Sequence, residues 1–242
     1  MSLGNAIGYL TPLRVPPRRQ VPLSYSIHYF PLIGAALGSL CILFFLAATR
    51  FLPNAVCCAL VVALSQFLGG WGSWRGVAEA MQRGRTYPGY GFRPGFRLDR
   101  RGALALGGLL ALKAGSLAVM PFEWQARAAF VFPILGHCAR TAVFLLGPLR
   151  AAAGGAIGGL SPVLRRRRVR AGSLCGALLF LIFLFPLRAA LPILAIGLLG
   201  AWRLAIARNR RSRGLTLQTA SVVSEAVECF LLATLALASF FM

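Results

Sequence analysis

The sequence predicts an all-α protein, a polytopic bundle of about seven membrane-crossing helices whose amino terminus lies in the cytoplasm. Of its 242 residues, 58% are hydrophobic and only 13% are charged, which is too little polar surface to cover a soluble domain. The apolar residues gather in runs close to the roughly 20 residues that cross a bilayer, and the arginines fall between these runs. The whole chain, 1–242, is therefore expected to form a single integral membrane domain.

Seven apolar runs are candidate spans. In chain order they are Tyr29–Ala48, Pro53–Trp71, Gly102–Met120, Ala126–Leu146, Gly172–Leu187, Ala189–Ala207 and Thr219–Phe241. The fifth and sixth are short and adjoin each other at Leu187 and Arg188, so they could instead form one long helix kinked at Pro186.

The distribution of arginine favours seven spans. With seven, 21 basic residues fall on one side of the membrane and only Arg50, Arg127 and Arg188 on the other, as the positive-inside rule predicts. Most of the 21 lie in two loops expected in the cytoplasm, a basic glycine-rich and aromatic loop at 72–101 and a basic loop at 148–171. A net charge of +21 spread in this way favours contact with anionic membrane lipid. It does not favour nucleic-acid binding, because no basic soluble domain is present to hold a duplex.

Four charged residues lie well inside the predicted spans, at least six residues from either end. Lys113 and Arg140 lie in the third and fourth, and Glu225 and Glu228 lie three residues apart on one face of the last. Charges inside a bilayer usually pair in the bundle interior or line a cavity. Two interpretations stay open: the charges only hold helices together, or they line a polar chamber open to the basic face, with His137 on its wall.

The six cysteines are predicted to be small buried hydrophobes, since they lie in apolar runs without metal-ligand spacing. They are Cys41, Cys57, Cys58, Cys138, Cys175 and Cys229.

Several stretches, taken in order, resemble the cobalamin synthase family, the membrane enzymes that act as adenosylcobinamide-GDP ribazoletransferases. They are TPLRVPPRR from Thr11, HYFPLIGAALG from His28, the pair Gly69 and Gly70, RLDRRGALALGGLLALKAGSL from Arg97, ILGHCARTA from Ile134 and RGLTLQTASVVSEAVECFLLA from Arg213. Lys113, Arg140, Glu225 and Glu228 stand at family positions of the same residue type. The resemblance implies a multi-pass protein of the bacterial inner (cytoplasmic) membrane.

The resemblance also implies a reaction, in which α-ribazole or its phosphate attacks the diphosphate of adenosylcobinamide-GDP and GMP leaves. The family signature His-x-Asp-Gly-x-x-Asp-x-x-Asp-Gly supplies carboxylates for Mg²⁺. Here Arg75, Glu79 and Gln82 stand at its three aspartates, and Gly95 and Gln218 stand at two further family aspartates. Glu79 is thus the one carboxylate left of five. Arginines repel a metal ion but can bind a diphosphate directly.

Two hypotheses follow, from different classes of protein. The first is a divergent transferase of late cobalamin biosynthesis that binds a corrinoid nucleotide, with Mg²⁺ if it is active and no cofactor otherwise. Its residues, by resemblance, are catalytic Glu79, Lys113 and Arg140, substrate-binding Arg75, Arg97, Glu225 and Glu228, and Glu79 as metal ligand. The second is a catalytically inactive homologue that serves as a structural or ligand-binding subunit of a membrane complex. The aromatic residues of the 72–101 loop are either interface anchors or a platform for a base or corrin edge.

Overall fold

The structure, a computed structural model, describes residues 3–13, 29–69, 74, 76–78, 98–146, 200, 203 and 217–241. Six helices have defined bounds in this part of the chain: α1 (Leu3–Leu10), α2 (Phe30–Ala48), α3 (Asn54–Leu68), α5 (Arg100–Ala118), α6 (Phe122–Leu146) and α10 (Leu217–Ser239). The described residues contain no strand, so the all-α prediction is confirmed for them.

The five longer helices coincide with five of the seven predicted spans. The remaining two, 172–187 and 189–207, lie outside the described residues apart from Gly200 and Arg203, and the number seven stays a prediction. Within the described part, two helices are long and apolar enough to cross a membrane: α2, with 19 residues, and the 20 residues of α10 from Ala220. The apolar helix α3 is shorter, at 15 residues.

Local sequence sets where the helices begin. Helix α5 starts at Arg100, two residues before the predicted span, because the carboxylate Oδ1 of Asp99 accepts a hydrogen bond of 2.6 Å from the backbone N–H of Gly102. Proline lies in the first turn of α2, where its missing N–H costs nothing. Helix α6 starts at Phe122, four residues before the predicted span, since its polar first turn continues the helix outside the apolar run.

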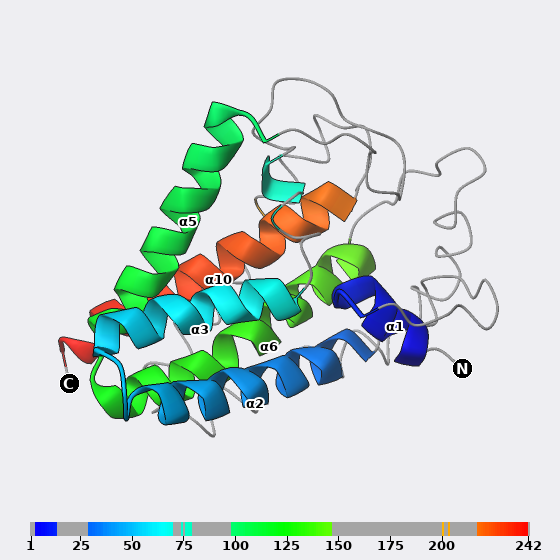
Figure 1. Cartoon of the computed structure of the whole chain (residues 1–242). Helices are drawn as coiled ribbons and strands as arrows, with labels where there is room; N and C mark the ends of the chain where they lie inside the picture. The colour runs from blue at the N-terminus through cyan, green and yellow to red at the C-terminus, as the bar shows by residue number, and fades with distance from the viewer. Residues whose placement is uncertain are drawn as a thin grey trace, which may run out of the picture.

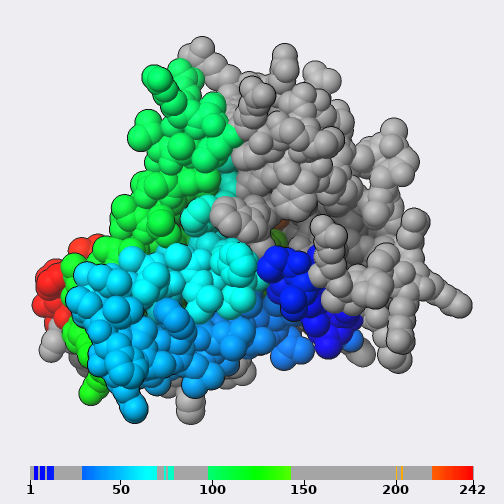
Figure 2. Space-filling model, in the orientation of Figure 1, coloured from blue at the N-terminus to red at the C-terminus, as the bar shows by residue number. Residues whose placement is uncertain are grey.

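The helix ends divide between two ends of the bundle (Figure 1). One end carries the short turns between α2 and α3 and between α5 and α6, together with the carboxy-terminal end of α10. The other carries α1, the amino-terminal ends of α2 and α10 and the carboxy-terminal end of α6. On the face shown in Figure 2, α2 and α3 lie side by side as one continuous surface. This alternation is the up-and-down order expected of successive membrane spans.

Glycine allows α2 and α6 to pack with their backbones in contact. Gly34 and Gly38 lie one turn apart on α2. A Cβ atom on Gly34 would lie 3.0 Å from the Cα of Ile134, and one on Gly38 would overlap the carbonyl oxygen of Phe130. This small-xxx-small spacing is typical of helix pairs in membranes.

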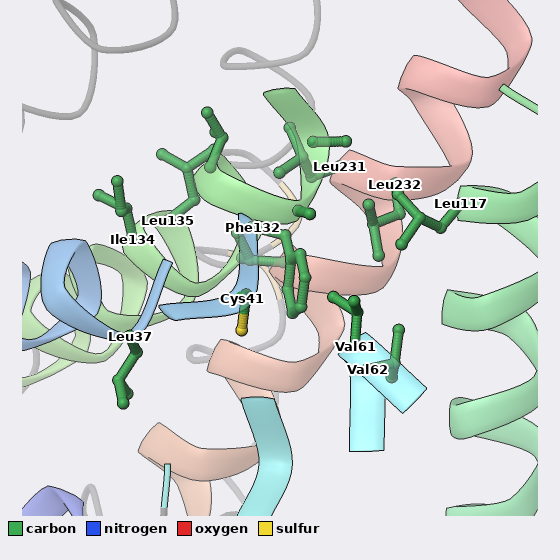
Figure 3. Close-up of a cluster of buried hydrophobic side chains, with 14 of the residues drawn as sticks. Leu37, Cys41, Val61, Val62, Leu117, Phe132, Ile134, Leu135, Leu231 and Leu232 are labelled. Atoms are coloured by element: carbon green, nitrogen blue, oxygen red, sulfur yellow. The ribbon is translucent and has the colours of Figure 1, made fainter. Parts of the chain in front are cut away.

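The core of the bundle is apolar and is centred on α6. Side chains from α2, α3, α5, α6 and α10 converge around Phe132, which is fully buried (Figure 3). Cys41 is part of this cluster. All described cysteines are buried and free, which confirms their predicted role as small hydrophobes; Cys175 lies outside the described residues.

Candidate functional site

Lys113 forms the centre of a buried charge cluster. Its Nζ lies 2.5 Å from Oε2 of Glu225 and 2.5 Å from Oε2 of Glu228. The three residues are 1%, 3% and 5% exposed, so the cluster is closed to bulk solvent. It joins α5 to α10 across more than a hundred residues of sequence.

Helix α10 presents both carboxylates on one face because Glu225 and Glu228 are three residues apart. Helix α6 makes room for them, since a Cβ atom on Gly136 would overlap the carboxylate of Glu228. The neighbouring Ser224 hydroxyl donates a buried hydrogen bond of 2.8 Å to the Gly136 carbonyl oxygen. The glutamates are therefore held in place by α6 as well as by the lysine.

Gln66 is a fourth member of the cluster. Its Nε2 donates a hydrogen bond of 3.1 Å to Oε2 of Glu225, and the residue is 8% exposed. Gln66 lies two residues before the end of α3, so the cluster ties α3 to α5 and α10. The prediction from charge missed it because the side chain is neutral. The available signal was an amide alone in an apolar run, which needs a partner when buried.

The electrostatics of the cluster extend to α6. Lys113 offsets one of the two glutamate charges, which leaves a formal charge of −1 for the three residues. The buried Arg140, 5% exposed, lies close enough for its positive charge to act on Glu228 and on His137. With Arg140 the set is formally neutral, as expected of buried charges that are stable together. The Lys113 ammonium also faces the Phe132 ring, with Nζ 6.0 Å from the ring centroid.

The structure brings Lys113, Glu225 and Glu228 into direct contact and places Arg140 beside them. The other proposed site residues, Arg75, Glu79 and Arg97, lie outside the described residues. Three residues just before Glu79 in the sequence are described. Gly76, Val77 and Ala78 are buried, and a Cβ atom on Gly102 would lie 3.3 Å from the Cβ of Ala78. This short helical piece therefore packs against the amino-terminal end of α5.

The described residues do not fit a magnesium ion. No group of three or more His, Cys, Asp or Glu side chains in the described part of the chain could hold a metal. Glu225 and Glu228 supply two carboxylates, but both already bind the Lys113 ammonium. Gln66 turns its amide N–H toward Glu225, and an N–H donor is not a ligand for Mg²⁺.

Fold and site together define a helical bundle with an apolar core, a buried lysine–glutamate cluster and two helices able to cross a membrane. A family model for cobalamin-5-phosphate synthase matches residues 2–78, a range that contains α1, α2, α3 and the start of the basic loop. The match confirms the family resemblance and supports a role in cobalamin synthesis. The searches of curated proteins and of solved structures each found no match.

Proposed function

We propose that this protein is a divergent cobalamin synthase of the bacterial inner membrane that transfers the adenosylcobinamide phosphoryl group from its GDP derivative to α-ribazole. In this reaction a ribazole hydroxyl oxygen forms a bond to phosphorus and releases its proton, the bond from that phosphorus to the GMP oxygen breaks, and GMP leaves with that oxygen. The observation that carries the proposal is the family match over residues 2–78.

The surface of the bundle supports a multi-pass membrane location. The outward faces of α2 and α3 carry large apolar side chains; Leu43 is 63% exposed and Phe67 is 52% exposed. Apolar surface of this extent is typical of lipid contact. Arg50 lies in the turn between α2 and α3 and Arg127 in the first turns of α6, so both lie at the end assigned to the outer face. This agrees with a basic cytoplasmic side that carries most of the other arginines.

In the proposed site, arginines bind the phosphates. One guanidinium group can donate two parallel hydrogen bonds to one phosphate group, so Arg75, Arg97 and Arg140 are assigned to the diphosphate. Glu79 is assigned to the reacting end of the substrate by its place in the family signature. Lys113 holds Glu225 and Glu228 in position and thereby fixes α10 against α5. Any Mg²⁺ that the reaction uses would be held outside the described residues, with Glu79 as the one carboxylate retained from the family signature.

Complementation tests the proposal. The chain is expressed in a bacterium that lacks its own cobalamin synthase, and growth is measured with cobinamide and dimethylbenzimidazole as the sole corrinoid precursors. We expect growth with the natural chain, loss of growth with Glu79→Ala and with Arg140→Met, and full growth with Gly107→Ala. The last is a matched control, because Gly107 is exposed on α5 with no atom within 4 Å of its Cβ position.

A negative result is also informative. If the natural chain reaches the membrane in normal amount and supports no growth, the transferase proposal is wrong. The function then falls to the second class, an inactive homologue that serves as a structural or ligand-binding subunit of a membrane complex.

A further inference from the structure

The two glutamates of α10 form the one part of the described site that resembles a metal centre. Glu225 and Glu228 are buried, lie one turn apart and direct both Oε2 atoms at a single point. Paired carboxylates that converge on one point in a dry interior are a common way to hold a divalent cation. Whether Glu225 and Glu228 can bind a divalent cation therefore depends on what already lies between their Oε2 atoms.

That point is taken by the side chain of Lys113. Its Nζ lies 2.5 Å from each Oε2 atom. A divalent ion bound to the same two oxygens would lie about 2.0–2.6 Å from them, and would therefore overlap the ammonium nitrogen. Two cations so close together would also repel each other strongly in an interior of low dielectric constant.

The lysine is enclosed in the core. Lys113 is 1% exposed, and its ammonium lies over the buried Phe132 ring. Moving it away would leave an unpaired ammonium in the core and two carboxylates with only Arg140 to offset them, which is strongly unfavourable. Gly136 and Ser224 hold α10 close to α6, so the carboxylates are not free to turn toward a second cation.

We propose that Lys113 is the resident cation of this site: its ammonium occupies the position of a divalent metal and closes the Glu225–Glu228 pair to Mg²⁺. Any divalent ion that the protein binds must therefore use other residues. The proposal does not depend on the transfer reaction and can be tested whether or not the protein is active.

Mn²⁺ replaces Mg²⁺ as the probe, because the paramagnetic resonance signal of free Mn²⁺ reports binding directly. The full-length protein is purified in detergent and titrated with Mn²⁺. The natural chain and the Glu225→Gln/Glu228→Gln variant are expected to bind equal amounts. Lys113→Met is expected to bind one additional Mn²⁺, with an affinity at least ten-fold higher than any binding of Mn²⁺ to the Glu225–Glu228 pair in the natural chain. The triple variant Lys113→Met/Glu225→Gln/Glu228→Gln should lose this additional ion.

Melting temperature gives a second readout. Mn²⁺ should raise the melting temperature of Lys113→Met by more than it raises that of the natural chain, because the additional bound ion stabilises the folded state further. If Lys113→Met cannot be purified in a folded state, the proposal is tested by comparing the amount of Mn²⁺ bound by the natural chain with the amount bound by Glu225→Gln/Glu228→Gln.

Three outcomes separate the possibilities. Mn²⁺ bound by the natural chain but lost in Glu225→Gln/Glu228→Gln would overturn the proposal. A folded Lys113→Met protein that gains no Mn²⁺ would also overturn it, since the lysine would then not be what excludes the metal. Mn²⁺ that is lost in Glu79→Ala and kept in Glu225→Gln/Glu228→Gln would support it and would place the metal at the basic loop.

Discussion

Replacing Lys113 with methionine should destabilise the protein more than any surface substitution. Methionine keeps most of the apolar stem, so the change removes the charge with little loss of packing. Both 2.5 Å contacts disappear, and two buried glutamates, 3% and 5% exposed, are left without their lysine. Removing one partner of a buried ion pair costs about 3–5 kcal/mol, which corresponds to a loss of roughly 100- to 5,000-fold in the folding equilibrium.

The control removes the uncompensated charge as well. In Lys113→Met/Glu225→Gln the one remaining carboxylate, Glu228, is offset by Arg140, so the set is again formally neutral, and buried ion pairs replaced by neutral groups often cost little. We therefore expect this variant to recover at least half of the lost stability. Both proteins are measured in detergent by the temperature at which the monodisperse peak in size-exclusion chromatography falls to half. A drop in this temperature of less than about 2–4 °C for Lys113→Met, which corresponds to the roughly 1 kcal/mol of an exposed pair, would refute the reasoning.

Three further predictions concern single contacts. Gly38→Ala should lower the stability to thermal unfolding by about 1–3 kcal/mol, because the new Cβ would overlap the Phe130 carbonyl oxygen and push α2 away from α6. Gly107→Ala should be neutral or slightly stabilising. Equal effects of the two substitutions would contradict the packing described. Asp99→Ala should lower the stability by about 1 kcal/mol in the same melts, because the cap of α5 is lost. Asp99→Asn should lower it much less, since asparagine also caps helices. An equal loss of stability in both variants would exclude a capping role. Gln66→Leu should lower the stability by about 1–3 kcal/mol, because it removes a hydrogen-bond donor from Glu225. This loss of stability should be smaller when Glu225→Gln is already present. Additive losses would show that the two side chains do not interact.

The positions of the helices could be read from the sequence because each described span is an apolar run bounded by charge, proline or glycine. The predicted boundaries differ from the observed ones where a helix continues into polar residues. Helix α6 starts four residues before its predicted span, since Glu123 and Gln125 fit a helix although they do not fit an apolar pattern. The Asp99 cap likewise adds Arg100 and Arg101 to α5.

The cluster could be predicted only in its charged part. Charge balance pointed to Lys113 and the two glutamates because a buried charge must find an opposite one. It gave no information on Gln66, which is neutral, or on Gly136, whose part is to leave space for Glu228. Such roles depend on the approach of two helices, and a linear pattern does not encode that approach. The roles of Glu79, Arg75 and Arg97 stay predictions.

The separation of Lys113 from its partners along the chain has a consequence for biogenesis. Glu225 is 112 residues further on, so at a synthesis rate of about 5–20 residues per second the lysine of α5 waits roughly 6–20 seconds before α10 is made. In a membrane setting, α5 must enter the bilayer before these two carboxylates exist or be held back until α10 arrives. The arrival of α10 is therefore the step that neutralises the charge of Lys113.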